Sequence, residues 1–215
     1  MKKLYGVVVP IVTPLTQEDA IDVTSLKRLA DHCIDSGMQA IYPCGTTGEM
    51  MYLSVEERRL VAETVVRHAA GRVPVFVHVG AWNLRDTVEL AKHAAEIGAD
   101  GIAVVTPAFF SVRDQGLVDY FTTVAKSVPQ DFPVYLYAIP QCAVNDISHK
   151  AAEECSRLCP NIVQLSGYDA YPADASDKRR AVQRAGRAGS SICRRLGDGR
   201  RRGSLRKRPD YPGLL

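Results

Sequence analysis

The sequence predicts an α/β fold: a TIM-type (β/α)8 barrel that is incomplete, with about six strands, followed by a disordered basic C-terminal tail. Short β-branched apolar runs alternate with longer segments of helical period from Tyr5 to about Leu165, the pattern of βαβ units around a parallel sheet. Residues 9–14 read Val-Pro-Ile-Val-Thr-Pro, where an open doubly wound sheet would carry a glycine-rich phosphate loop, so the barrel is favoured. After Tyr168 the alternation stops.

The strand candidates are short apolar runs bounded by turn-forming residues. In chain order they cover residues 6–12, 40–43, 75–79, 101–105, 134–137 and 162–165.

The helix candidates cover residues 24–36, 54–70, 84–97, 114–128 and 148–159. Thr24 and Ser54 can cap the first two, and Glu57 would complete a capping box with Ser54. Three glycines stand where helices should end: Gly37, Gly71 and Gly98. In the first helix the apolar residues share one face and can cover one side of a sheet; they are Leu26, Leu29, Ala30, Cys33 and Ile34.

The chain divides into two segments that differ in net charge. Residues 1–168 hold 14 Lys+Arg and 19 Asp+Glu, a charge of −5, whereas residues 169–215 hold 13 and 5, a charge of +8. We therefore expect a partial barrel domain over 1–168 and an Arg-rich tail over 169–215 that is disordered or out of frame. The tail could instead bind nucleic acid or an acidic partner, but it contains no recognisable nucleic-acid module and little aromatic interleaving, and we favour a shifted reading frame.

Composition excludes several classes of protein. The chain has no apolar run of membrane-spanning length and no signal-peptide pattern, so we expect a cytoplasmic protein without a membrane partner. Its six cysteines form no Cys-x-x-Cys pair and no zinc-type spacing with histidine, which predicts reduced thiols and no metal site.

Candidate site residues follow the second strand, because functional groups in parallel α/β folds gather after the carboxyl ends of strands. Gly45 and Gly48 flank Thr46 and Thr47, whose hydroxyls can bind a carboxylate together with main-chain N–H groups. The spacing also suits a turn in which the hydroxyls bond to their own backbone. Both interpretations remain open.

Tyr137 is the second candidate. Tyr135 and Tyr137 share one face of the fifth strand, and Tyr137 is nearer the carboxyl rim. A phenol there can transfer a proton or hydrogen-bond an oxyanion, and it can equally be a structural tyrosine.

Five segments together resemble the dihydrodipicolinate synthase and N-acetylneuraminate lyase family of pyruvate-dependent class I aldolases. In order they are residues 9–14, Gly45-Thr46-Thr47-Gly48-Glu49, Val105-Thr106-Pro107, Tyr137-Ala138-Ile139-Pro140 and Pro160-Asn161-Ile162-Val163. The resemblance implies a TIM barrel, a homotetramer, no cofactor, and a lysine Schiff base with pyruvate. It implies that Thr46 and Thr47 bind the carboxylate of pyruvate and that Thr46 also connects to the proton relay. It implies that Tyr137 is the acid/base phenol.

The departures from the family pattern concern catalysis. The family's sixth strand ends in the Schiff-base lysine, whereas this chain has Ser166 there, or has lost a segment that held the lysine. The arginine for a second carboxylate corresponds to Cys142, and the tyrosine contributed across a subunit interface corresponds to Phe109 or Phe110. We therefore expect a lyase of a sugar-acid-like 2-oxo acid rather than a dihydrodipicolinate synthase.

The predicted function is a carbon–carbon lyase or aldolase whose partners are pyruvate and an aldehyde, crippled here because the catalytic lysine is missing. Two alternatives remain: a non-catalytic binding module that uses its basic tail, and a fragment without function. A fragment without function would follow from instability, since about 165 patterned residues supply six strands and a closed barrel takes roughly 250 residues.

Overall fold

The computed structural model describes residues 6–167, all of which belong to the first of the chain's two units, Met1–Ala170. The strands are β1 (Val8–Pro10), β2 (Ala40–Tyr42), β3 (Phe76–His78), β4 (Gly101–Val105), β5 (Val134–Ala138) and β6 (Ile162–Gly167). The helices are α1 (Val23–Asp35), η1 (Met50–Tyr52), α2 (Val55–Ala69), α3 (Leu84–Glu96), α4 (Asp114–Lys126), α5 (Pro140–Ala143) and α6 (His149–Leu158). The expected tail and its boundary lie outside the described residues.

Strand order distinguishes the two folds that the alternation allowed. β1 pairs with β2, and β3, β4, β5 and β6 pair in sequence, all in parallel. A parallel bridge between Ile41 and Val75 and a hydrogen bond from His78 N to Pro43 O (3.1 Å) join β2 to β3. Each strand therefore lies beside the next in sequence, without the reversal of a doubly wound sheet, and the predicted partial TIM barrel is confirmed.

The strands turn alternate side chains to the two faces of the sheet. Val77 and Leu136 belong to the large core that the helices share. Phe76 and Tyr135 belong to a separate interior cluster, where their rings meet edge to face at 5.2 Å and 85°. A Cβ at Gly101 would lie 2.8 Å from Phe76 Cε1, so the bulk of Phe76 requires glycine beside it.

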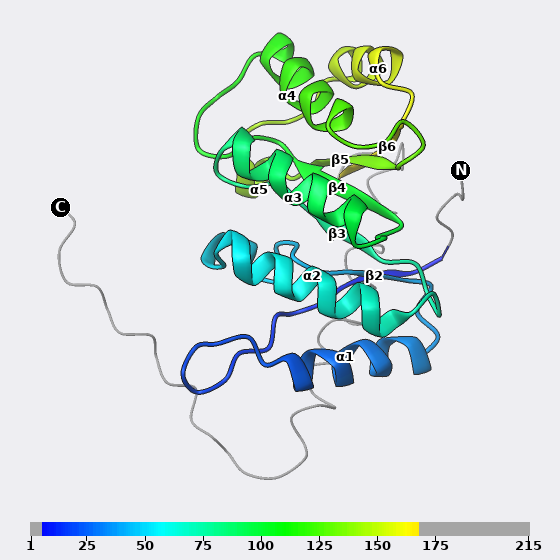
Figure 1. Cartoon of the computed structure of the whole chain (residues 1–215). Helices are drawn as coiled ribbons and strands as arrows, with labels where there is room; N and C mark the ends of the chain where they lie inside the picture. The colour runs from blue at the N-terminus through cyan, green and yellow to red at the C-terminus, as the bar shows by residue number, and fades with distance from the viewer. Residues whose placement is uncertain (1–5, 168–215) are drawn as a thin grey trace, which may run out of the picture. The chain divides into compact units, whose positions relative to one another are not determined.

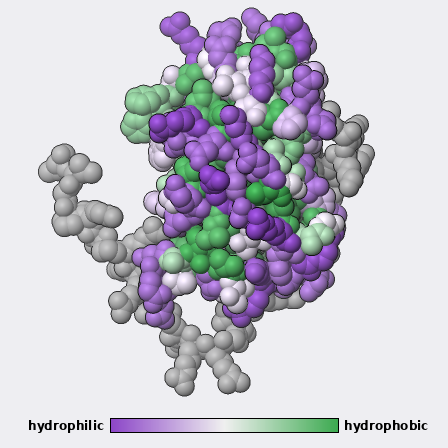
Figure 2. Space-filling view, in the orientation of Figure 1, coloured by the Kyte–Doolittle hydropathy of each residue, from purple (hydrophilic) through white to green (hydrophobic). Residues whose placement is uncertain are grey.

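The longer helices, α1, α2, α3, α4 and α6, form one continuous layer beside the strands (Figure 1). α1 packs against α2, α2 against α3, α3 against α4, and α4 against α6. In the view of Figure 2, hydrophilic side chains cover much of the surface and hydrophobic residues show between them, as amphipathic helices predict.

Most predicted helix boundaries are confirmed. Ser54 and Glu57 form the capping box of α2, with bonds of 2.8 Å and 3.2 Å. The three predicted terminal glycines, Gly37, Gly71 and Gly98, all have positive φ. Thr24 as the first cap is wrong: Asp22 caps α1, because its carboxylate accepts from Ser25 N at 2.9 Å.

Two short elements and one strand length differ from expectation. Neither η1 nor α5 was predicted, because each is too short to show a helical period. β1 covers only three of the seven residues expected. Pro10 lacks an N–H, and beyond it only Ile11 N continues the pairing, donating to Tyr42 O at 3.1 Å.

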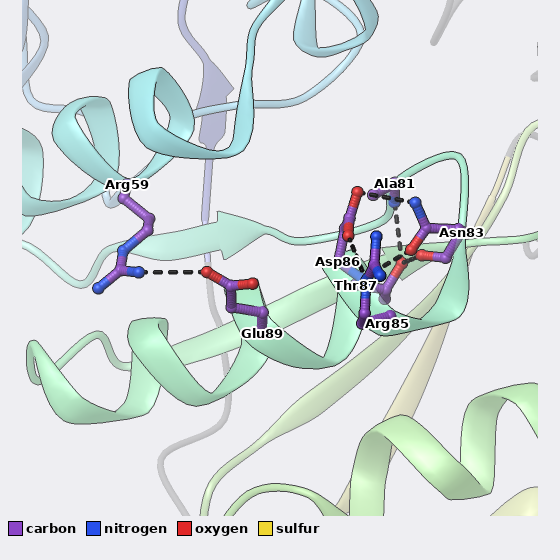
Figure 3. Close-up of polar contacts among 7 residues, drawn as sticks. All are labelled: Arg59, Ala81, Asn83, Arg85, Asp86, Thr87 and Glu89. Atoms are coloured by element: carbon purple, nitrogen blue, oxygen red, sulfur yellow. Dashed lines mark hydrogen bonds and ion pairs between the residues drawn. The ribbon is translucent and has the colours of Figure 1, made fainter.

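The connection from β3 to α3 is held by two side chains at the start of α3, those of Asn83 and Thr87 (Figure 3). Asn83 caps α3 by accepting from Asp86 N at 2.8 Å. Thr87 Oγ1 accepts from Ala81 N and donates to Asn83 O, both at 3.0 Å. These bonds fix the backbone of residues 80–83, which borders the cavity described next.

Candidate active site

A cavity of about 260 Å³ opens at the carboxyl ends of the strands. The loop after β2 contributes Thr46 and Glu49, the loop after β3 contributes Gly80, β4 contributes Val105, and the segment after β5 contributes Ile139. Functional sites of (β/α)8 barrels lie at this end. The cavity is therefore the candidate active site.

The loop after β2 is built tightly around its two glycines. A Cβ at Gly45 would lie 2.6 Å from Tyr42 Cε1, and one at Gly48 would lie 3.1 Å from Ile11 O. Thr13 Oγ1 donates to Gly48 O at 2.7 Å, which anchors the loop to the segment after β1. The sequence pattern therefore reflects close packing at both glycines.

Thr46 and Thr47 are both exposed, and Thr46 lines the cavity. The bonds that close the turn come from the N–H groups of Gly48 and Glu49, which donate to Gly45 O at 3.0 Å and Thr46 O at 3.1 Å. Among the described residues, neither threonine hydroxyl bonds to a neighbour. The alternative in which these hydroxyls satisfy their own backbone is therefore not what the structure contains. Thr46 is available to a ligand in the cavity, whereas Thr47 is exposed outside the cavity lining.

Tyr137 lies beside the cavity and is half-buried. Its side chain packs with Met50, Val105 and Ala143, all of which line the cavity. The structure thus brings three predicted residues, Thr46, Thr47 and Tyr137, to the same end of the barrel from β2 and β5.

Two aromatic residues next to Tyr137 were not predicted as site residues. The Tyr137 ring centroid lies 6.5 Å from that of Tyr42 and 6.1 Å from that of His78, and Tyr42 and His78 lie 6.0 Å apart. All three pairs are edge to face. Tyr42 and His78 end β2 and β3, so the rule that singled out Tyr137 applied to them as well.

Burial dominates the electrostatics of this aromatic cluster. The Tyr42 phenol has a pKa well above its usual range, because burial and the neighbouring Tyr137 disfavour the phenolate. Burial and the nearby Arg58 guanidinium lower the pKa of His78 to about 3. Both side chains are therefore neutral near pH 7.

Arg58 of α2 is a buried cation, 3% exposed. Its guanidinium donates to Gly80 O at 2.9 Å and to His78 O at 2.8 Å, and no carboxylate pairs with it in the described part of the chain. Burial lowers the pKa of Arg58. The residue ties α2 to the carboxyl end of β3, directly under the cavity.

Asn145 organises the loop after β4. Its side chain donates to Pro107 O and Phe110 O and accepts from Val112 N, each at 2.7 Å. Phe109 and Phe110 of the same loop are 71% and 73% exposed. Nothing in the spacing of the sequence points to Asn145.

The strand register shows what stands beside Tyr137 on β6. Ser166 is its partner in the parallel β5–β6 pair. The lysines within residues 6–167 all lie on helices: Lys27 on α1, Lys92 on α3, Lys126 on α4 and Lys150 on α6. No strand end in this part of the chain carries a primary amine.

The described residues contain no group of three or more His, Cys, Asp or Glu side chains that could hold a metal ion. None of their helices combines the length and apolar character needed to cross a lipid bilayer.

Comparison with known proteins identifies relatives of the partial barrel. The model of the dihydrodipicolinate synthetase family matches residues 3–168. N-acetylneuraminate lyase from Rattus norvegicus is 37% identical over 179 residues, which are 82% of this chain and 55% of the relative.

Two solved structures are similar in fold and sequence. One is chloride-inhibited dihydrodipicolinate synthase from Acinetobacter baumannii complexed with pyruvate, with a TM-score of 0.72 and 34% identity over 76% of this chain and 56% of that one. The other is a catalytic lysine mutant of Ruminococcus gnavus sialic acid aldolase, with a TM-score of 0.73 and 29% identity over 78% of this chain and 55% of that one. The chain thus spans about half the length of the relatives it matches.

Proposed function

The chain belongs to the dihydrodipicolinate synthetase family, and from that premise we propose that its site binds pyruvate or a related 2-oxo acid without forming a Schiff base. The carbon–carbon lyase chemistry of its relatives is the function from which the site derives. The observation that carries the proposal is the register of β6, which places Ser166 beside Tyr137.

Recognition of the 2-oxo acid falls to the loop after β2. Thr46 and Thr47 offer two unbonded hydroxyls at the end of a loop whose backbone is fixed by close packing at Gly45 and Gly48. A carboxylate is a strong acceptor, so hydrogen bonds to it are stronger than bonds between neutral groups. The relative from Acinetobacter baumannii was solved with pyruvate, which supports this ligand class.

Loss of the covalent step follows from chemistry. An imine forms when a primary amine adds to the ketone and water leaves, and a serine hydroxyl cannot complete the second stage. The Ruminococcus gnavus relative was solved as a catalytic lysine mutant, which supports the need for an amine in this family. In this chain position 166 lies next to the proposed acid/base phenol but carries no amine.

The test is reductive trapping. Incubated with pyruvate and borohydride, the full chain should gain no mass, whereas the Ser166→Lys variant should gain one reduced pyruvate adduct that peptide mapping places at residue 166. Ser166→Arg, which adds a cation without a nucleophilic amine, is the matched control and should gain nothing. A stable adduct on any lysine of the unchanged chain, or no adduct in Ser166→Lys, would contradict the proposal.

A further inference from the structure

His78 is a buried polar residue in the aromatic cluster that the proposed function does not use. It is the last residue of β3 and is 1% exposed. Val77, its neighbour, belongs to the core shared with the helices, and Phe76 belongs to the interior cluster of the barrel. By alternation His78 faces the interior, as its ring contacts with Tyr42 and Tyr137 show.

The imidazole lies just below the cavity. A Cβ at Gly80, which lines the cavity, would be 3.0 Å from His78 Cε1 and 2.7 Å from Val105 Cγ1. Val105 is the register partner of Tyr137 and packs with it. His78, Val105 and Tyr137 are therefore contiguous beneath Gly80, whereas Tyr42 packs against the lower interior cluster.

Both ring nitrogens of His78 are buried and make no hydrogen bond of normal geometry among the described residues; a backbone group of Cys44 lies near the ring and raises the pKa of His78, a smaller influence than burial and Arg58. A neutral imidazole carries one donor and one acceptor, and leaving each unsatisfied costs about 1–3 kcal/mol. An apolar ring would fill the same space without that cost. The titratable and charged groups that face His78 are Tyr42 on β2, Cys44 after β2, Arg58 on α2 and Tyr137 on β5, of which Cys44 and Arg58 are buried.

Resting on the proposed role of Tyr137 as the acid/base phenol, we propose that His78 is a positioning residue. Its neutral imidazole holds the Tyr137 hydroxyl by a hydrogen bond, bridged by one water or formed directly when the side chains adjust. The two rings meet edge to face with centroids 6.1 Å apart, so small rotations about the side-chain bonds bring the phenol oxygen and an imidazole nitrogen within reach of each other or of one shared water. The bond would fix the direction of the phenolic O–H and so orient the phenol toward the ligand.

The first arm of the test is spectroscopic and needs no ligand. In the full chain labelled with ¹⁵N-histidine, the His78 nitrogens should have the shifts of a neutral, hydrogen-bonded imidazole, and Tyr137→Phe should move them. Tyr42→Phe is the matched control, because its ring lies at almost the same distance, 6.0 Å, and it should leave them in place. Shifts that respond to Tyr42→Phe alone, or to neither variant, overturn the proposal.

The second arm uses adduct formation in the Ser166→Lys background. His78→Phe should slow adduct formation at saturating pyruvate by about three- to tenfold, the effect of losing one hydrogen bond, and leave the half-saturating concentration unchanged. His78→Gln keeps a donor and an acceptor and should recover most of the rate. Equal rates of adduct formation in Ser166→Lys and in its His78→Phe and His78→Gln variants overturn the positioning role. Equal losses of rate in the two His78 variants overturn it as well.

The two arms separate this inference from the proposed function. If Ser166→Lys forms no adduct, the proposed function fails and the ¹⁵N arm still decides whether His78 holds Tyr137. If the adduct forms at the same rate with His78→Phe, the proposed function stands and the role of His78 fails.

Discussion

Ser166 of β6 is the register partner of Tyr137 of β5, so the two residues stand side by side at the carboxyl end of the barrel. An amine placed at position 166 would therefore have a phenol as its neighbour on the adjoining strand. That relationship predicts what Tyr137 contributes once the amine is present.

In the Ser166→Lys background, Tyr137→Phe should lower the maximal rate of adduct formation by roughly 100-fold or more, the lower range of general acid–base contributions. The half-saturating pyruvate concentration should change little, because the carboxylate is bound elsewhere. Single-turnover trapping over a range of pyruvate concentrations measures both quantities. If Tyr137→Phe changed only the half-saturating pyruvate concentration and left the maximal rate unchanged, Tyr137 would bind pyruvate rather than transfer a proton.

Thr47→Val should weaken pyruvate binding by about tenfold, since a hydrogen bond to a charged group is worth about 1.5–3 kcal/mol and valine retains the shape of threonine. Calorimetric titration of the otherwise unchanged chain measures the affinity without a covalent step. Thr24→Val alters an exposed threonine at the start of α1 and should leave the affinity unchanged. Equal affinities for the unchanged chain and Thr47→Val would remove Thr47 from the site.

Local sequence signals predicted the elements because they depend on neighbouring residues. Ser54 and Glu57 are three positions apart, and their capping box forms as expected. Asp22 displaced Thr24 as the first cap because Asp22 can reach Ser25 N, a competition between two suitable residues that spacing alone does not resolve. The order of the strands is known from their pairing in the structure, because periodicity in the sequence does not determine which strands are neighbours.

The site was predicted where a motif is contiguous and missed where it is assembled in space. Thr46 and Thr47 stand between two glycines in the sequence, whereas Tyr42, His78 and Tyr137 come together from three strands. Asn145 acts on a loop 33 to 38 positions earlier in the chain, so no local pattern identifies it. Long-range contacts of this kind are decided by the fold.

His78 should make the chain less stable in acid. Its pKa in the folded state is about 3, below the value of 6.5 for the free side chain, so the unfolded chain binds the proton more readily. The contribution of His78 to the free energy of unfolding is therefore present above about pH 6.5 and is lost as the pH falls toward 3. Between these values the free energy of unfolding should fall by about 1.4 kcal/mol per pH unit at most.

His78→Phe removes this titration. Urea unfolding at pH 7 and at pH 4.5 should show that the variant loses less stability on acidification than the unchanged chain, whatever the substitution costs at pH 7. Identical losses in the two proteins would show that His78 is not desolvated in solution.

Two adjacent arginines of α2 provide a matched pair for measuring what holds β3 in place. Arg58 is buried and donates to His78 O and Gly80 O, whereas Arg59 is 44% exposed and pairs with Glu89 at 3.2 Å (Figure 3). Arg58→Met leaves two carbonyls of β3 and its loop without a donor and should lower the free energy of unfolding by about 2–4 kcal/mol. Arg59→Met should change it by less than about 0.5 kcal/mol, because solvent screens exposed ion pairs.

Urea denaturation of both variants measures this difference, and pyruvate titration extends it to the site. Because Arg58 fixes the backbone on either side of Val79, its loss should also displace Gly80 from the cavity wall and weaken pyruvate binding. Replacing a buried cation can be neutral when the surroundings repack, so equal stabilities of the two variants would mean that β3 holds its position without Arg58. The cavity would then owe its shape to strand pairing and to the Thr87 bonds rather than to the guanidinium.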